Sequence, residues 1–178
     1  RYEAVLDREL RRRQVPDTTS PAVASWAGRM DLLGCTIDTS EVLPAEAVWL
    51  TCRWRAREHV RQAWRLDLRL EGGFEPVVSD VKPLDGLLPT FQWEAGVVVE
   101  DEVRVFVPPD AKPGPARVFV GWERYGDGAI AMDAGGDRFE VGTVTVLPPL
   151  YPYDGGGSGA LVEVPSEDPG QGAAAVEP

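Results

Sequence analysis

The chain has 178 residues, of which 43% are hydrophobic and 26% charged, and its formal net charge is −11. This length allows a buried core, and the composition is that of an ordinary globular protein. Such a charge repels a phosphate backbone, which disfavours nucleic-acid binding, and no apolar run approaches the ~18 residues of a membrane-spanning helix. The chain begins with Arg1 rather than Met, so we expect an upstream segment to have been removed or left out; a signal peptide and a membrane anchor both fit.

The first segment, residues 1–15, is predicted to form a short amphipathic helix. Its apolar residues recur at near-helical spacing, and arginines crowd its last turn, where positive charge suits the helix dipole; the apolar positions are Tyr2, Val5, Leu6 and Leu10. Pro16 lies just beyond the expected end of the helix. Residues 16–28, with their prolines and small polar residues, are interpreted as a linker.

From residue 29 to residue 148 the apolar residues recur with a period of two, which is typical of strands that bury one face. WRLDLRLE alternates apolar and charged residues throughout, and VVVEDEVRVFVP, ARVFVGWER, AIAMD and RFEVGTVTVLP provide further strands. Glycines and prolines separate these segments. The pattern predicts an all-β chain with an antiparallel β-sandwich over 29–148, a short N-terminal helix and an extended C-terminal tail.

The two cysteines, Cys35 and Cys52, lie in MDLLGCTID and AVWLTCRWRA and are in phase with the apolar residues of those strands. Both are therefore expected to face the same core. Two alternatives stay open: buried free thiols, which pack as small hydrophobes, or a disulfide, which would imply an oxidising compartment. Two cysteines are too few to support a structural zinc site.

The segment PPDAKPGP joins two predicted strands, and its prolines reduce the entropy lost on ordering a long turn. If these strands form a symmetric hairpin, Val105 pairs with Val120 toward the core. Phe106 then pairs with Phe119 on the opposite face. Paired outward aromatic residues indicate a surface that a partner covers.

Residues 149–178 form a tail rich in glycine, proline and alanine, with five acidic and no basic residues after Pro148. Alone, such a tail is predicted to be disordered, and a partner would be needed to order it. Its two tyrosines, Tyr151 and Tyr153, join Phe106 and Phe119 as candidate partner contacts.

We predict no catalytic residue, no metal ion and no cofactor. The single histidine, His59, lies in a polar connection without a visible base or orienting partner. Ser158 in GGGSGA lacks both the final glycine and the strand-turn-helix of a nucleophile elbow. Two acidic groups match neither an EF-hand nor a glycosidase carboxylate pair: Asp127, Asp133 and Asp137, and Glu100, Asp101 and Glu102.

Three aromatic residues outside the apolar phase are candidates for stacking on sugar rings. Trp49 is out of phase with its strand, Trp93 lies in the loop-like PTFQWEAG, and Tyr125 precedes a turn. The other strand tryptophans are in core phase and are expected to be buried. These three residues carry the alternative prediction of a glycan site.

The order of these motifs resembles the soluble β-sandwich at the C-terminal, extracytoplasmic end of bacterial membrane glycosyltransferases of the dolichyl-phosphate-mannose mannosyltransferase type. The likeness covers residues 28–147 and rests on Pro89, Thr90, Trp93, Gly96, Asp101, Pro108, Pro109, Gly114 and Gly121. In such proteins the chemistry belongs to the membrane part. The resemblance therefore implies a non-catalytic domain that faces the periplasm or exterior, and it carries no catalytic residue to this chain.

Two functions follow as hypotheses. The first is a non-catalytic, extracytoplasmic structural or interaction subunit that is membrane-associated and docks on an integral-membrane protein complex. The alternative is a carbohydrate-binding module accessory to a membrane glycosyltransferase. An enzyme is not expected, because no acid, base and nucleophile converge.

Overall fold

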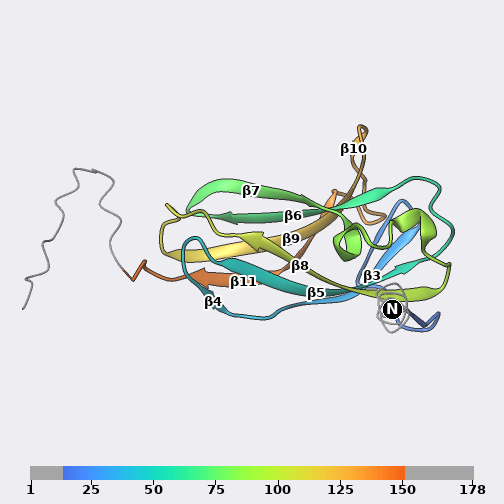
Figure 1. Cartoon of the computed structure of the whole chain (residues 1–178), viewed down its shortest axis with the longest axis horizontal. Helices are drawn as coiled ribbons and strands as arrows, with labels where there is room; N and C mark the ends of the chain where they lie inside the picture. Colours follow the sequence, from blue (N-terminus) through green and yellow to red (C-terminus); the bar gives the residue numbers. More distant parts are fainter. Residues whose placement is uncertain (1–13, 151–178) are drawn as a thin grey trace, which may run out of the picture.

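The computed structural model describes residues 14–150, which form two β-sheets joined by short connections (Figure 1). Sheet A has the order β1(Gln14–Pro16), β8(Val97–Phe106), β5(Ala47–Ala56), β3(Met30–Ile37), β2(Ala24–Trp26). Sheet B has the order β4(Glu41–Val42), β11(Arg138–Val146), β9(Gly114–Arg124), β6(Trp64–Gly72), β7(Phe74–Val81), and β10(Gly128–Ala129) pairs with β9. The all-β, sandwich-like class is thus confirmed, although β4 and β11 run parallel rather than antiparallel. No helix of the described residues is long and apolar enough to cross a membrane.

The alternation in the strands produces the core. In β6 the side chains of Trp64, Leu66, Leu68 and Leu70 are all buried, as their period of two predicts. The predicted phase also holds in β8, where Val99, Val103, Val105 and Val107 at its end are buried. Burial of such side chains stabilises a fold by about 1.5–3 kcal/mol each relative to exposure.

Tryptophans occupy the centre of the core. Trp122 of β9 packs against Trp54, Trp64 and Trp93, with ring centroids 4.8, 6.2 and 6.0 Å away. Trp26 extends the group, with its centroid 5.7 Å from that of Trp54. The predicted core positions of Trp54, Trp64 and Trp122 are therefore confirmed, and this aromatic group joins both sheets.

The predicted hairpin between the strands around PPDAKPGP is wrong. β8 belongs to sheet A and β9 to sheet B, so this proline-rich connection crosses from one sheet to the other. Val105 pairs with Val48 of β5, and Val120 pairs with Leu68 of β6. The alternation of each strand fixes which face is buried, but it does not select the neighbouring strand.

The segment 16–28 is not a linker, because it contains the end of β1 and all of β2. Between these strands, Asp17 accepts hydrogen bonds from the amides of Thr19 and Ser20 and from the Ser20 hydroxyl. The Ser20 and Thr19 hydrogen bonds hold the pKa of Asp17 well below its ordinary value. Arg55 of β5 donates to the carbonyls of Asp17 and Ser20, which fastens this turn to sheet A. The predicted helix 1–15 lies outside the described residues except for its last two positions, which belong to β1.

Asp31 of β3 anchors the same region and is fully buried. It accepts hydrogen bonds from the Ser25 hydroxyl at 2.7 Å and from Arg55 Nη2 and Arg57 Nε, each at 2.7 Å. Burial opposes ionisation of Asp31, but the hydrogen bonds from Ser25 and Arg55 and the charges of both arginines outweigh it and lower its pKa. The carboxylate therefore joins β2, β3 and β5 on one side of sheet A.

The cysteines form a disulfide, which decides between the two alternatives. Cys35 of β3 and Cys52 of β5 are directly opposite each other in the sheet, with Cα atoms 4.0 Å apart. Cys52 is fully buried in the core, whereas Cys35 is partly buried. The bond links two neighbouring strands of sheet A.

Candidate functional site

Three side chains, of which Trp49 is half-buried and Arg104 and Phe106 are exposed, form a cluster on the outer side of sheet A, hereafter the Trp49–Arg104–Phe106 cluster. Trp49 of β5 and Arg104 of β8 are register partners, so their side chains leave the sheet on the same side. The Arg104 guanidinium carbon lies 4.9 Å from the ring centroid of Trp49 and 5.2 Å from that of Phe106. Phe106 is 52% exposed. Both distances allow a cation–π interaction with the arginine.

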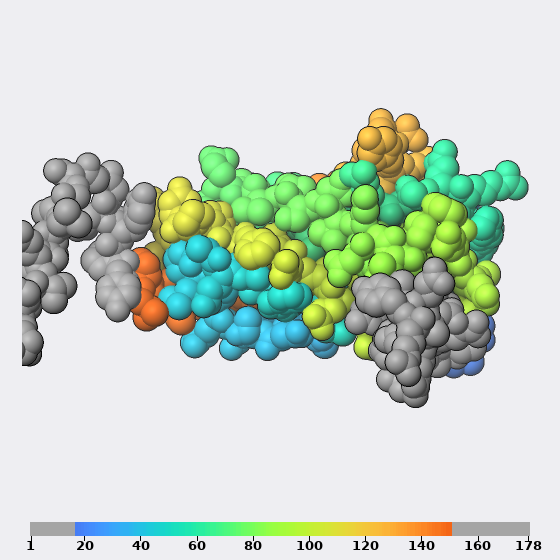
Figure 2. All heavy atoms as spheres, in the orientation of Figure 1, coloured from blue at the N-terminus to red at the C-terminus, as the bar shows by residue number. Residues whose placement is uncertain are grey.

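The cluster borders a groove of about 430 Å³ between an edge of each sheet. It is lined by Trp49, Ser79, Val81, Asp85, Glu102, Val103, Arg104 and Phe106. Figure 2 shows this side of the molecule, with β7 in green close to the end of β8 in yellow and to β5 in cyan.

β1 lies beside only the first residues of β8. β1 pairs only with Val97, Val98 and Val99 of β8. Within residues 14–150, no strand pairs with the rest of β8 on that side, because β5 occupies the other side.

Arg104 is the charged residue of the cluster, and it forms no ion pair with any other residue of the described range. Its two aromatic neighbours shield it in part from water. An arginine in this setting binds a carboxylate well, because its planar guanidinium can donate two parallel N–H hydrogen bonds to the two carboxylate oxygens. The cluster therefore combines an apolar contact surface with one specific anion contact.

Phe119, the other predicted partner contact, is only 9% exposed and lies on β9 of sheet B, away from Phe106. The Arg117 guanidinium carbon lies 4.7 Å from its ring centroid. Its register neighbours are Arg69 of β6 and Glu140 of β11. The predicted pairing of the two phenylalanines is wrong, because their strands belong to different sheets. The remaining predicted contacts, Tyr151 and Tyr153, lie outside the described residues.

Charged residues cover the outer side of sheet B around Phe119. Asp67 is 3% exposed and pairs with Arg138 at 2.7 Å, and Arg117 pairs with Glu140 at 3.1 Å. Burial raises the pKa of Glu123, and the charges of Asp80 and Asp67 raise it further, against the opposing charges of Arg65 and Arg138.

The three predicted glycan contacts do not form one platform. Trp93 is 1% exposed, and its indole N–H donates to the Leu88 carbonyl at 2.9 Å, so its predicted exposure is wrong. Trp49 lines the groove beside β8, whereas Tyr125 is 75% exposed and lines a different hollow with Trp64 and Arg65. The loop around Trp93 resembles a surface segment in sequence, but it folds back over the core.

The polar residues considered for catalysis or metal binding either lie exposed or accept hydrogen bonds from backbone amides. His59 is exposed between β5 and β6. Asp101 is in the apolar phase of β8 and is buried, where it accepts the Leu84 amide at 3.1 Å. Asp133 accepts the Gly28 amide at 2.7 Å. In the part of the chain that the structure describes, no three His, Cys, Asp or Glu side chains gather as a metal cluster.

Several residues that carry the family resemblance position the loops between β7 and β8. The Thr90 hydroxyl accepts the Trp64 amide at 2.8 Å and donates to the Gln62 carbonyl at 3.3 Å. Gly96, with φ of 80°, donates its amide to the Ala56 carbonyl at 2.8 Å. A Cβ at Gly121 would lie 2.8 Å from the Asp137 carbonyl oxygen, so only glycine fits there. These roles concern loop and strand packing and require no ligand.

Sequence reasoning missed Arg104 as a site residue. A usable signal existed, because Arg104 lies between two buried valines and two residues before Phe106, on the outward phase of its strand. The contact with Trp49 needs the pairing of β5 with β8, which the sequence does not give.

No family model and no curated protein matches the chain. Among solved structures, it is similar to an alkylpurine DNA glycosylase AlkC from Pseudomonas fluorescens (TM-score 0.40, 13% identity, 67% of this chain and 31% of that one). A β-glucosidase from Listeria innocua gives a TM-score of 0.41 at 14% identity over 74% of this chain and 17% of that one. A Niemann-Pick type C2 protein from Japanese carpenter ant gives 0.35 at 10% identity, over 74% and 97%. The chain spans less than a third of the first two proteins, and likenesses this distant identify no family and no function.

Proposed function

We propose that the chain is a non-catalytic accessory domain that lies outside the cytoplasm and docks on a membrane-bound protein assembly. The observation that carries this proposal is the Trp49–Arg104–Phe106 cluster, in which Phe106 is 52% exposed. Protein interfaces are enriched in tryptophan, phenylalanine and arginine, and a few such residues supply most of the binding energy.

The partner is proposed to contribute an extended segment with an acidic side chain. Its apolar side chains would contact Trp49 and Phe106, and its carboxylate would pair with Arg104. The two rings provide apolar contact area, and the arginine provides specificity for the carboxylate.

Two further observations support a location outside the cytoplasm. The disulfide between Cys35 and Cys52 fits an oxidising compartment, since disulfides are rare in the cytosol. The resemblance to extracytoplasmic domains of membrane glycosyltransferases supports the same location, with the membrane-bound enzyme as one kind of assembly to which such a domain belongs.

The test is native separation of gently solubilised source membranes, followed by mass spectrometry to locate the chain. We expect the wild-type chain to co-migrate with a large integral-membrane complex. The double variant Arg104→Gln/Phe106→Ser should lose this co-migration, because a contact residue at an interface centre contributes about 2 kcal/mol or more.

The matched control is Phe91→Ser, which also removes an exposed phenylalanine, 40% exposed, but on the η2 turn(Thr90–Gln92) away from the groove. This variant should co-migrate like the wild type. If the wild-type chain migrates as a small free species, or if Phe91→Ser disrupts co-migration as strongly as the groove variant, the proposal is wrong.

A further inference from the structure

The groove beside the Trp49–Arg104–Phe106 cluster carries acidic as well as basic side chains. Besides Arg104, its charged lining residues are Asp85 and Glu102. Within residues 14–150, neither of these acidic residues forms an ion pair. The whole chain has a net charge of −11. A segment with only acidic charges would therefore meet like charges in the groove, so one carboxylate on the partner does not match the charges of this lining.

Glu102 and Arg104 lie next to each other on the outer face of β8. They are two residues apart and both exposed, and strand geometry separates them by roughly 6–7 Å along the chain. Arg104 packs against the rings of Trp49 and Phe106, and Phe106 is the next outward residue on the side away from Glu102. The two opposite charges therefore stand in a row along the groove, and each can pair with its own counter-ion.

The sheet itself compensates the preceding acidic residue of this face but not Glu102. Glu100, also exposed on β8, lies opposite Arg53 of β5 and does not line the groove. Glu102 lies opposite Thr51, which carries no charge. Because opposite charges across a strand pair stabilise each other, Glu100 has a cationic neighbour in its own sheet. A cation from a partner therefore fits Glu102 rather than Glu100.

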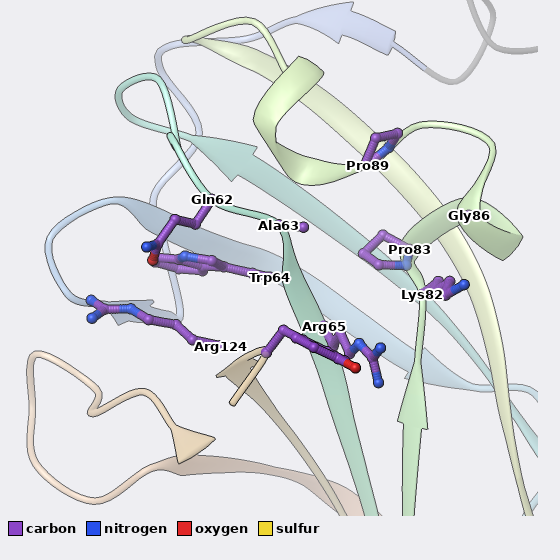
Figure 3. A pocket seen from close by; sticks show the side chains of 10 residues that line it. Gln62, Ala63, Trp64, Arg65, Lys82, Pro83, Gly86, Pro89 and Arg124 are labelled. Atoms are coloured by element: carbon purple, nitrogen blue, oxygen red, sulfur yellow. The ribbon is translucent and has the colours of Figure 1, made fainter. Parts of the chain in front are cut away.

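A larger hollow of about 570 Å³ shows no such row of charges. It adjoins the turn η1(Pro83–Gly86), whose Asp85 lines the groove, and Lys82, Arg124 and Tyr125 are among its lining residues. Figure 3 shows the side chains of Lys82 and Arg124 on opposite sides of this hollow. Its two cations therefore do not meet one group, and the regular arrangement of charges belongs to the groove.

We propose that the segment bound in the groove carries a lysine or arginine, an acidic residue and an apolar residue in this order, each two positions from the next. This inference rests on the proposed docking function, because it concerns the partner of the same groove. The cation pairs with Glu102, the carboxylate with Arg104, and the apolar side chain contacts Phe106. In an extended segment every second side chain lies on one side, at the same roughly 6–7 Å spacing as in β8.

The order of the charges gives the groove its specificity. A segment with the same composition but with its two charges exchanged places a cation against Arg104 and a carboxylate against Glu102. Like charges in contact cost binding energy, so such a segment is rejected. Reversing the direction of the segment does not rescue it, because its apolar residue belongs at Phe106.

The experiment is titration of the ¹⁵N-labelled full chain with three short peptides in which threonines alternate with three varied residues. The matched peptide has lysine, glutamate and leucine, the exchanged peptide has glutamate, lysine and leucine, and the acidic peptide has glutamate, glutamate and leucine. We expect the matched peptide to shift the resonances of the Trp49 indole and the Phe106 amide. The other two peptides should bind at least ~10-fold more weakly.

The variant Glu102→Arg/Arg104→Glu exchanges the two charges of the groove. It should reverse the preference, so that the exchanged peptide binds about 10-fold more tightly than the matched one. Glu102→Gln should reduce the wild-type preference, whereas the control Glu100→Gln, on the same strand and face, should keep it. The proposal is overturned if the matched and exchanged peptides bind the wild type equally, if no peptide binds up to about 10 mM, or if the two glutamine variants act alike.

The membrane separation keeps this inference apart from the docking function. Glu102→Gln should weaken co-migration with the membrane complex, and Glu100→Gln should not. If Arg104→Gln/Phe106→Ser loses co-migration while Glu102→Gln migrates like the wild type, docking stands and the charge order is wrong. If the wild-type chain migrates as a small free species, the docking function is wrong, and the peptide preference still decides whether the groove selects this order of charges.

Discussion

Phe106 and Phe119 both point away from the core, yet one is 52% exposed and the other only 9%. The difference comes from their strand neighbours. Phe119 lies in the middle of sheet B, with Arg69 on one side, Glu140 on the other and Arg117 over its ring. Phe106 ends β8, and within residues 14–150 its register partner is Ala47 of β5, on one side only. An outward aromatic residue therefore indicates a partner only when its own sheet leaves it uncovered.

The two sheets also differ in how their strands are joined. Sheet A has a disulfide between β3 and β5. Both sheets have an ion pair on a buried carboxylate, Asp31 with Arg55 in sheet A and Asp67 with Arg138 in sheet B, but within residues 14–150 only sheet A has a disulfide.

The largest effect should come from removing the disulfide of sheet A. The bond spans a sequence separation of 17, and closing such a loop stabilises a fold by roughly 3 kcal/mol. We expect Cys35→Ala/Cys52→Ala to lose about that much in urea unfolding. Dithiothreitol should lower the stability of the wild type and leave the variant unchanged. A reductant effect on the variant would contradict the assignment.

The ion pairs of sheet B should matter next. Arg138→Met keeps most of the aliphatic stem but leaves the buried Asp67 without its counter-ion. A stranded buried charge is costly, and we expect a loss of about 2 kcal/mol because Arg138 is itself partly exposed. The control Arg117→Met breaks the exposed pair with Glu140 and should cost less than about 1 kcal/mol. Equal losses of stability in the two variants would show that the burial of an ion pair does not determine how much it contributes.

The comparison of the two phenylalanines can be measured directly. Phe119→Ala should lower the free energy of unfolding by about 2 kcal/mol, because a largely buried ring is lost. Phe106→Ala should change it by less than about 0.5 kcal/mol, as at other exposed positions. Urea denaturation of both variants gives the two values. A loss at Phe106 as large as that at Phe119 would mean that Phe106 packs within the isolated domain.

The smallest effect concerns the pH dependence of sheet B. Burial of Glu123 raises its pKa above the ordinary value of 4.5. At pH values between the ordinary pKa and the raised pKa, the folded state therefore binds more protons than the unfolded state. The stability that Glu123 contributes is present at low pH and is lost as the pH rises through the raised value. Glu123→Gln should therefore gain stability relative to the wild type between about pH 4.5 and neutrality.

The control for this pH series is Glu94→Gln, an exposed position outside sheet B. Its stability relative to the wild type should stay constant over the same pH range. A gain at low pH rather than at neutral pH in Glu123→Gln would reverse the sign and contradict the raised pKa.

Sequence patterns predicted most strands and the buried residues of β6 and β8, because alternation is a local property of each strand. They did not predict the exposed cluster, because Trp49 and Arg104 are far apart in the sequence and meet only through the pairing of β5 with β8. They also placed Trp93 at the surface. Its loop has no regular alternation of apolar and polar residues, so the sequence gave no phase that would point Trp93 toward the tryptophan core.

The sequence by itself determined that this chain is an all-β domain and which residues its strands bury. It also showed that Cys35 and Cys52 are in phase with the apolar residues of two strands. Tertiary structure alone decided that β8 and β9 belong to different sheets, that the two cysteines lie opposite each other, and that Lys82, Arg124 and Tyr125 surround one pocket. The physical reason is that alternation sets the orientation of a side chain relative to its own strand. Which strand lies beside it depends on the packing of the whole core.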